Sequence, residues 1–306
     1  MKKCAVIGSI NMDMVTRVDR FPRPGETRMG ISFATVPGGK GANLAVALGK
    51  LGVPVRMAGR VGGDGFGKQY LEHFASVGVD TSLVKLSPQN TTGTATIEVS
   101  DEGENHIVVV AGANLDCDIV WLEETLKDLE EEEMVLLQLE IPHSTVWQAI
   151  ARLHEMGKTI VLDPAPAVEL PEEILPMITY LTPNETELRI LTPSLPEEAD
   201  APARIRLLLQ KGVQCVVHKA GAHGAYLADA SGIEHIPGYA VKAVDTTAAG
   251  DTFNAGFVAG LAMGPSLQEA VRMGNAAGAI SVTAPGAQGG MPNMRQVEQL
   301  LRGEKA

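Results

Sequence analysis

The residue types best suited to chemistry lie in residues 243–253, which read AVDTTAAGDTF. Ala248, Ala249 and Gly250 are small enough for the backbone to approach a ligand closely, and Asp251 opens a long run of helix-forming residues. The first N–H groups of a helix have no partner within the helix, and the helix dipole favours an anion beside them. The segment therefore predicts an anion-binding helix start that presents a carboxylate. N-capping is an alternative role for an Asp at this position, and it stays open here.

A second loop, GGKGAN at residues 38–43, also opens a run of small, helix-forming residues. Glycines beside Lys40 indicate either a phosphate-binding loop or a tight turn that permits close packing. The loop is not of the Walker A type, since no Ser or Thr follows Lys40. Residues 62–65, GGDG, do not fit a dinucleotide-binding fingerprint, because an acid stands where a pyrophosphate would lie. A nucleotide, if one binds, must be held in another way.

Polar residues also follow several apolar runs that read as strands. Asn11 and Asp13 come after the first run, Glu140 after a later one, and Asn184 with Glu187 after another. Ligands of open α/β sheets bind beyond the carboxyl ends of the strands. The first pair suits a polyol, while the last pair suits either a hydrated Mg²⁺ or a helix capping box. One shared site would explain all of these clusters, whereas polar turns would need a separate reason for each.

Alternating strand and helix patterns must position these residues. Strands are expected at residues 3–7, 55–58, 133–139, 159–162, 177–181 and 214–218, and helices at 41–51, 65–76, 144–156, 201–211, 251–263 and 267–282. Alternation at this spacing predicts an α/β fold with a mainly parallel central sheet flanked by helices on both faces.

Two stretches interrupt the alternation. Residues 14–36 hold β-forming segments around a Pro- and Gly-containing stretch, and residues 93–110 are typical of a hairpin around a polar turn at 101–104. We expect these two stretches to form a small β-sheet lid. The main α/β domain is then expected to comprise residues 1–13, 37–92 and 111–306.

Composition limits the partners of the 306-residue chain. Hydrophobic residues make up 45 % and charged residues 20 %, which is typical of a globular protein. The formal net charge of −12 argues against non-specific nucleic-acid binding. No uncharged apolar run approaches the roughly 18–20 residues that span a bilayer, so no membrane helix is expected. Three scattered cysteines, Cys4, Cys117 and Cys215, favour a reduced, cytoplasmic protein without a disulfide framework.

The motifs GSINMD, GGKGAN, TPNETE and DTTAAGDTF, in this order, resemble those of the ribokinase branch of the PfkB-type carbohydrate kinases. The segments VVAGAN at 109–114 and DPAPA at 163–167 favour the same branch. The resemblance implies a ribokinase-like fold and ATP-dependent phosphorylation of D-ribose at its 5-hydroxyl, which gives D-ribose 5-phosphate and ADP. It also implies Mg²⁺, K⁺ as a monovalent activator, and a homodimer formed through the lid.

The same resemblance assigns roles by position. Asp251 would take the proton from the sugar's primary hydroxyl, next to an anion hole formed by the backbone of residues 248–251. Sugar contacts would come from Asn11, Met12, Asp13, Gly39, Lys40, Gly41, Ala42, Asn43, Glu140 and Asp251. ATP would lie against Asn184, Lys219, Ala220, Gly221, Ala222, His223, Gly224, Gly250, Asp251 and Asn275. Glu187 would organise Mg²⁺ through water, and a monovalent cation would be held by Asp245, Thr247, Ser281, Ala284, Gly286 and Gly290.

Three alternatives to a ribose kinase remain at this point. The same family includes kinases of other sugars, such as deoxyribose, fructose or 2-keto-3-deoxygluconate, and kinases of nucleosides. A nucleoside base would need stacking partners, and the expected lid offers few aromatic side chains, namely Phe21 and Phe33. A non-catalytic sugar sensor is disfavoured by the presence of Asp251 with its small-residue neighbours.

Overall fold

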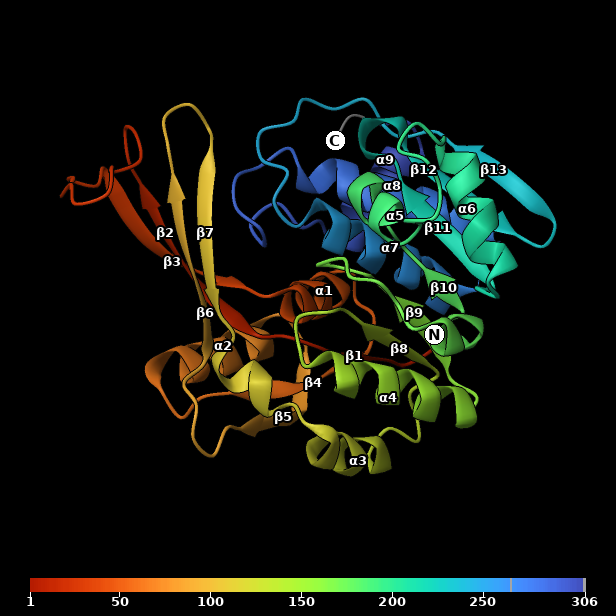
Figure 1. Cartoon of the computed structure of the whole chain (residues 1–306), viewed down its shortest axis with the longest axis horizontal. Helices are drawn as coiled ribbons and strands as arrows, with labels where there is room; N and C mark the ends of the chain where they lie inside the picture. The colour runs from red at the N-terminus through yellow and green to blue at the C-terminus, as the bar shows by residue number, and fades with distance from the viewer. Residues whose placement is uncertain (265, 305–306) are drawn as a thin grey trace.

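The computed structural model describes residues 1–264 and 266–304 and arranges them in two β-sheets, the larger of which is covered by helices (Figure 1). The larger sheet has the strand order β13-β12-β11-β10-β9-β8-β1-β4-β5. Its strands are β1 Cys4–Ile7, β4 Val55–Val61, β5 Asp80–Leu86, β8 Met134–Leu137, β9 Thr159–Leu162, β10 Tyr180–Leu181, β11 Cys215–Lys219, β12 Ala225–Asp229 and β13 Gly232–Ile236. Neighbours from β11 to β5 pair in parallel, and β12 and β13 pair antiparallel at one edge. The expected mainly parallel sheet is confirmed.

Helices cover both faces of the larger sheet, since the central strands carry apolar side chains on both sides. In β1, Cys4 and Val6 join one hydrophobic cluster, while Ala5 and Ile7, which point to the opposite face, join another. The first cluster contains side chains of α1 Lys40–Lys50, α2 Gly65–Ser76, α7 Ala249–Met263, α8 Leu267–Ser281 and α9 Met294–Leu301. The second contains side chains of α3 Ile119–Lys127, α4 His143–Glu155, α5 Glu185–Ile190 and α6 Ala201–Gln210.

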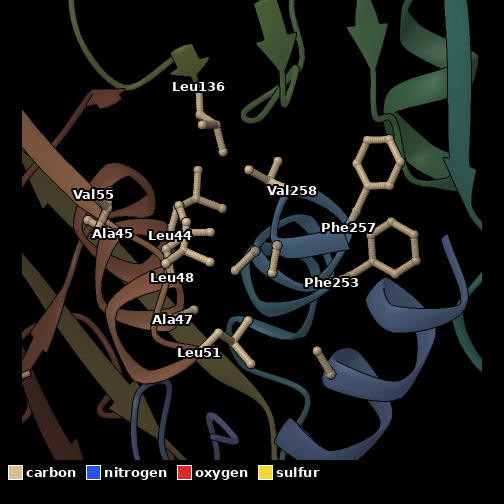
Figure 2. Close-up of a cluster of buried hydrophobic side chains, with 14 of the residues drawn as sticks. Leu44, Ala45, Ala47, Leu48, Leu51, Val55, Leu136, Phe253, Phe257 and Val258 are labelled. Carbon is tan, nitrogen blue, oxygen red and sulfur yellow. The ribbon is translucent and has the colours of Figure 1, made fainter. Parts of the chain in front are cut away.

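Packing of α1 against α7 brings together the starts of two helices that carry candidate site residues. Leu44 and Leu48 of α1 face Val258 of α7 across the cluster shown in Figure 2. The many small residues of α7 have a separate reason, which is the close approach of α8. A Cβ on Gly260 would stand 2.5 Å from the Cα of Ala270. The small residues of α7 therefore allow its close packing against α8.

The four strands of the smaller sheet project from the main body as two hairpins (Figure 1). They are β2 Asn11–Arg17, β3 Ser32–Gly38, β6 Gly93–Val99 and β7 Asn105–Val110, in the order β3-β2-β6-β7. Each hairpin is antiparallel, and parallel pairing of β2 with β6 joins them. We call this sheet the lid. Asn11, the first residue of β2, pairs with Gly38 of β3 on one side and Gly93 of β6 on the other.

Most expected elements are confirmed, but the sequence analysis did not list strand β5 or helices α3 and α9, and two further regions differ. The strand expected at 177–181 is reduced to Tyr180–Leu181, because a 3₁₀ helix, Glu172–Met177, occupies the preceding residues. The hairpin β12–β13, which the sequence analysis did not anticipate, forms one edge of the main sheet. None of the helices in residues 1–264 and 266–304 has the length and apolar character needed to cross a membrane.

Candidate active site

The candidate site lies at the carboxyl ends of β1 and β8, where the direction of chain progression changes. From β1 the chain moves outward to β4 and β5, then returns to β8 on the other side of β1. Such a switch point leaves a crevice beyond the strand ends. Ser9 follows β1, and its hydroxyl donates to Glu140 Oε2 at 2.6 Å; Glu140 follows β8. The two strand ends therefore meet in one polar cluster.

The first turn of α7 supplies backbone donors to this crevice. Its N-cap, Ala248, has φ 57° and ψ 17°, and no other non-glycine residue in the described part of the chain has positive φ. This left-handed geometry costs an alanine roughly 1–2 kcal/mol. The amide of Ala249 donates to Thr246 O at 3.2 Å, so it is already engaged. Within the described residues the amides of Gly250 and Asp251 donate no hydrogen bond, so they form the available part of the expected anion hole.

Asp251 is 5 % exposed and meets two residues of α1. Asn43 Nδ2 donates to Asp251 Oδ2 at 2.9 Å, and Lys40 Nζ lies 4.0 Å from Asp251 Oδ1. Burial raises the pKa of the Asp251 carboxyl, and the Lys40 ammonium and the Asn43 amide oppose that effect. The Asp251 carboxyl is therefore buried beside one ammonium and accepts a hydrogen bond from one amide.

The GGKGAN loop achieves its position through close backbone contact. Gly39 has φ 87°, and a Cβ on Gly41 would stand 2.7 Å from Ser9 N. The expected tight packing is therefore present. The backbone amide of Lys40 donates to Glu140 Oε2 at 3.0 Å, and the nearby charge of Asp251 raises the pKa of the Lys40 ammonium. Lys40 thus connects the β8 strand end to the first turn of α7.

Asn11 and Asp13 line the root of the lid. Asn11 Oδ1 accepts from Asn114 Nδ2 at 2.7 Å, while Asn114 Oδ1 accepts from the amide of Ile10 at 2.9 Å. Asn114 was part of a family motif in the sequence, but its role in fixing Asn11 was not anticipated. Burial and the neighbouring Glu140 raise the pKa of Asp13 to about 7. Acidic and amide groups therefore face one another where a ligand rich in hydroxyls would fit.

Two of the expected sugar-binding residues point elsewhere with their side chains. Met12 and Ala42 are fully buried and belong to the hydrophobic cluster on the α1 face of the sheet. Alternation along β2 explains Met12, because its neighbours Asn11 and Asp13 point to the opposite side. The side chains of these two residues therefore pack in the hydrophobic core.

A second charged group lies beside the α7 start, at the ends of three further strands. Lys219 of β11 is 9 % exposed and forms an ion pair with Asp163, which follows β9, at 2.7 Å. The Lys219 ammonium is 3.9 Å from Glu187 Oε2 and 3.5 Å from the point where a Cβ on Gly250 would stand. It therefore lies beside Gly250 in the first turn of α7. The sequence analysis placed Lys219 beside a nucleotide but gave Asp163 no role.

Asn184 and Glu187 form the capping box that was one of their two expected roles. Asn184 Oδ1 accepts from the Glu187 amide at 2.9 Å, and Glu187 Oε2 accepts from the Asn184 amide at 2.7 Å. Asn184 Nδ2 also donates to Glu187 Oε1 at 2.7 Å. Burial raises the pKa of the Glu187 carboxyl, and the Lys219 ammonium opposes this. The capping box leaves Glu187 beside Lys219, so it does not exclude a part in binding.

A cavity of about 460 Å³ adjoins the α7 start. Its lining includes Lys219, Gly221, Ala222, Gly224, Gly250 and Asn275 from the expected nucleotide set. Asn184, Ala220, His223 and Asp251 of that set do not line it, and His223 is solvent-exposed. Ala249, expected in the anion hole, also lines it. The sequence analysis assigned no role to the rest of the lining, Gly238, Tyr239, Ala240, Val241, Ala243, Thr246, Phe253, Gly278, Ala279 and Val282. Its mix of apolar walls and a cationic end suits a flat base with an anionic tail.

The expected monovalent-cation residues fall on two adjacent loops. Asp245 Oδ1 accepts from the Thr247 amide at 2.9 Å and from its hydroxyl at 2.7 Å, and Asp245 Oδ2 accepts from the Gly286 amide at 2.8 Å. A Cβ on Gly290 would collide with the carbonyl oxygen of Ser281 and would stand 3.4 Å from that of Ala284. The carbonyl oxygens of Ser281 and Ala284 therefore lie close together beside Gly290, which has no side chain. Among the described residues no three His, Cys, Asp or Glu side chains converge as a metal site.

The fold is of the α/β class, with a mainly parallel sheet between two layers of helices. The crevice at its strand ends contains a buried carboxylate and a helix start with free amides, which is the arrangement of a group-transfer enzyme. The pfkB family carbohydrate kinase model matches residues 1–294, and the chain belongs to that family.

Similar proteins agree with this assignment. The chain is 44 % identical to the ribokinase of Bacillus subtilis over 302 residues, which cover 98 % of this chain and all of that protein. The crystal structure of ribokinase from Thermotoga maritima superimposes with a TM-score of 0.92 at 37 % identity, covering 99 % of this chain and 100 % of that one. Arabidopsis thaliana ribokinase, solved in complex with ribose and ATP, gives a TM-score of 0.90 at 33 % identity and covers 98 % and 99 %. These neighbours confirm the expected ribokinase-like fold.

Proposed function

We propose that the protein transfers the γ-phosphoryl group of ATP to the 5-hydroxyl of D-ribose. The observation that carries this proposal is the juxtaposition of the buried Asp251 carboxylate with the free amides of Gly250 and Asp251 at the α7 start. A base for an alcohol and donors for a transferring phosphoryl group are thereby within one helical turn. Full-length similarity to ribokinases supports ribose as the acceptor.

Asp251 accepts the proton of the attacking hydroxyl in this proposal. Phosphoryl transfer needs little covalent help from the protein, so positioning and charge stabilisation carry most of it. The two amides act on the charge of the transferring group without reorganisation, because the helix already fixes them. Lys40 adds a cation on the sugar side, and Lys219 adds one on the opposite side.

The sugar lies between the lid root and the start of α1. Asn11, Asp13, Asn43 and Glu140 offer amide and carboxylate groups to its hydroxyls. Closure of the lid over the sugar excludes water, which would otherwise accept the phosphoryl group. The backbone of the GGKGAN loop completes the wall on the α1 side.

ATP occupies the cavity of about 460 Å³ in this proposal, with its base against the apolar lining and its phosphates toward Lys219. Mg²⁺ accompanies the phosphates. Glu187 is a buried carboxylate 3.9 Å from the Lys219 ammonium, so its charge faces the expected phosphate position and suits contact with the ion through water. When bound, Mg²⁺ neutralises phosphate charge. The residues Asn184 and Glu187 stay joined through their capping box.

A monovalent cation, which we take to be K⁺, fits the loops at 245–247 and 281–290. The Asp245 carboxylate and the carbonyl oxygens near Gly290 are the oxygen donors that such an ion requires. A Cβ on Gly290 would collide with the carbonyl oxygen of Ser281, so in this proposal the ion is held there by backbone oxygens. The ion would stabilise the loop that leads into the α7 start.

A homodimer formed through the lid is part of the proposal. The lid exposes large apolar side chains, which are Met29, Ile31, Phe33, Ile107, Val108, Val109 and Val110. Exposed apolar strands at a sheet edge favour pairing with another chain.

A cytoplasmic location is also part of the proposal. Cys4, Cys117 and Cys215 are free and buried, in accord with the reduced cytoplasmic setting that the sequence favours.

A panel of sugars tests the substrate assignment. ADP release would be measured for ribose, deoxyribose, fructose, 2-keto-3-deoxygluconate and a nucleoside, and we expect the highest kcat/KM with ribose. A higher value for any other acceptor overturns ribose as the substrate. Mass spectrometry of the product distinguishes a kinase from a sugar sensor, which would bind ribose and yield no phosphorylated sugar.

A further inference from the structure

A buried chain of polar side chains runs from the interior of the cleft toward α2 and passes through Gln288. This residue lies in the loop between α8 and α9, is 5 % exposed, and was not among the residues singled out in the sequence. Its backbone carbonyl accepts from Lys50 Nζ at 2.5 Å, which ties the loop to the end of α1. Its side chain lies between Asn43 of α1 and Tyr70 of α2.

The side-chain amide of Gln288 uses all of its groups there. Gln288 Nε2 donates to Asn43 Oδ1 at 2.9 Å and to the Tyr70 hydroxyl at 3.0 Å. Gln288 Oε1 lies 2.7 Å from His73 Nε2. A carbonyl oxygen can only accept, so His73 Nε2 donates and the amide cannot turn over without facing its oxygen toward Asn43 Oδ1.

The hydrogen bond from Gln288 sets the orientation of the Asn43 amide in the cleft. Because Asn43 Oδ1 accepts from Gln288, Asn43 Nδ2 is left to point at Asp251 Oδ2, to which it donates at 2.9 Å. A reversed Asn43 amide would place its oxygen against the carboxylate. We propose that Gln288 is a positioning residue that orients the Asn43 amide as a donor to Asp251. The proposal rests on the proposed role of Asp251 as the base.

This role explains why a glutamine is buried here. An isolated buried amide is costly, and three satisfied bonds offset that cost. A donor fixed on one carboxylate oxygen keeps that oxygen engaged and leaves Oδ1, on the Lys40 side, for the hydroxyl of the sugar. Gln288 lies within the proposed cation loop at 281–290, and its bond to Asn43 links that loop to the residue that donates to Asp251.

The test compares Gln288→Met with the single variant Asn43→Ala and with their combination. Gln288→Met keeps the length of the side chain and removes the donor. We expect kcat to fall roughly two- to tenfold, the effect of one neutral hydrogen bond, while KM for ATP stays unchanged. The double variant should have a kcat within about twofold of Asn43→Ala alone, because Gln288 acts through Asn43.

Lys50→Met is the matched control, because it removes the bond to the backbone carbonyl of Gln288 and leaves the side-chain amide of Gln288 in place. We expect its kcat to stay near that of the wild type. Gln288→Glu serves as a second variant if the methionine variant does not fold, since an ionised carboxylate cannot donate to Asn43. The proposal would be overturned if the kcat losses of Gln288→Met and Asn43→Ala add up in the double variant, or if Lys50→Met loses as much kcat as Gln288→Met.

The proposed function is judged separately. Absence of phosphoryl transfer by the wild type, or a normal kcat in Asp251→Asn, would refute the kinase or the base assignment. An active wild type with a defective Asp251→Asn variant and a normal Gln288→Met variant refutes the positioning role alone.

Discussion

The carboxylate of Asp251 reconciles two opposing requirements. A base for an alcohol must have a higher pKa than an ordinary aspartate, and burial supplies this. It must also stay ionised before the reaction, and an unpaired buried charge is unfavourable. The Lys40 ammonium at 4.0 Å and the Asn43 amide at 2.9 Å meet that second requirement. The side chain therefore depends on the start of α1 as much as on its own helix.

Replacement of Asp251 by Asn should abolish most turnover and spare sugar binding. Asn has nearly the same shape but accepts no proton, so we expect kcat to fall by about 10²- to 10⁴-fold, the usual contribution of a positioned base. Ribose affinity, measured by calorimetry, should change little. Asp128→Asn, at the exposed C-cap of α3, is the control and should keep a normal kcat. A near-normal kcat in Asp251→Asn would remove the base assignment.

Asp13 predicts a pH dependence of stability. Its folded pKa of about 7 lies above the ordinary value near 4, so the folded protein holds a proton there that the unfolded chain releases. The contribution of Asp13 to the free energy of unfolding therefore declines as the pH rises from about 4 to about 7. Urea denaturation of the wild type and of Asp13→Asn across this range measures the difference. Parallel pH profiles for the two proteins would contradict the raised pKa.

The same carboxyl should make sugar binding depend on pH. An ionised carboxylate accepts a hydrogen bond from a hydroxyl more strongly than its protonated form does. Ribose affinity measured by calorimetry should therefore rise between pH 6 and pH 8, through the value of about 7 for Asp13. In Asp13→Asn the affinity should be lower and should not rise. A wild-type affinity that is constant over this interval would argue against contact between Asp13 and the sugar.

At the scale of elements, three parallel strands deliver the charged group near the α7 start. Asp163 follows β9, Glu187 belongs to the helix after β10, and Lys219 ends β11. Parallel neighbours end at the same edge, so residues distant in sequence come into contact. Loss of Lys219 leaves two buried carboxylates without their cation, whereas loss of Asp163 leaves Lys219 with Glu187 at 3.9 Å.

A double-mutant cycle should reveal this asymmetry. Lys219→Met is expected to lower the free energy of unfolding by about 3–5 kcal/mol, the cost of breaking a buried pair. Lys219→Met combined with Asp163→Asn should be more stable than Lys219→Met alone, because one orphaned charge is gone. The exposed pair Arg189–Glu185 provides the control, and Arg189→Met should cost less than about 1 kcal/mol. Equal costs for both pairs would contradict the argument.

The loops at 245–247 and 281–290 predict activation by potassium. At constant ionic strength, kcat should be higher in K⁺ than in Na⁺ or choline, because the ion stabilises the loop before α7. Asp245→Asn removes the charge that Thr247 and Gly286 hold in place, and it should reduce the response to K⁺. Equal rates in all three salts would show that these loops bind no activating cation.

Local signals made much of the fold predictable from sequence. The helix Gly65–Ser76 was expected at its observed bounds, since Asp64 caps its start and Gly78 has φ 77° after its end. Strand β9 was expected for its buried apolar run. Strand β10 was overestimated because a 3₁₀ turn shares its apolar composition. Edge strand β13 escaped notice because most of its residues are exposed and lack an alternating pattern.

The candidate site was predictable where a motif carries its own geometry. Asp251 and the residues around it form such a motif. Gln288 is different, because its bond to Asn43 joins positions 245 residues apart, and no local pattern marks it. Asn114 and Asp163 lay inside recognisable motifs, but only the tertiary structure shows that they hold Asn11 and Lys219. Sequence therefore pointed to the candidate reacting groups, and the structure shows which residues contact and orient them.

At the scale of the whole molecule, the lid and the cleft share residues. Strand β2 begins at Asn11, so part of the expected sugar contact lies on the lid itself. The lid projects from the main body (Figure 1). It also exposes large apolar side chains to solvent. Every residue of β7 is exposed in the single chain, although the strand carries four consecutive large aliphatic residues. Such a surface is unfavourable in water, and a second copy of the chain would cover it.

Sedimentation should therefore give twice the 32.3 kDa mass of the chain. Adjacent residues of β7 point to opposite faces, so Ile107→Asp and Val108→Asp probe the two faces separately. We expect at least one of them to produce monomers, because a carboxylate cannot be buried there without a partner. Val120→Asp, at an equally exposed valine of α3, is the control and should stay dimeric. A wild-type monomer at micromolar concentration would contradict pairing of the lids, and lid closure would then depend on contacts within one chain.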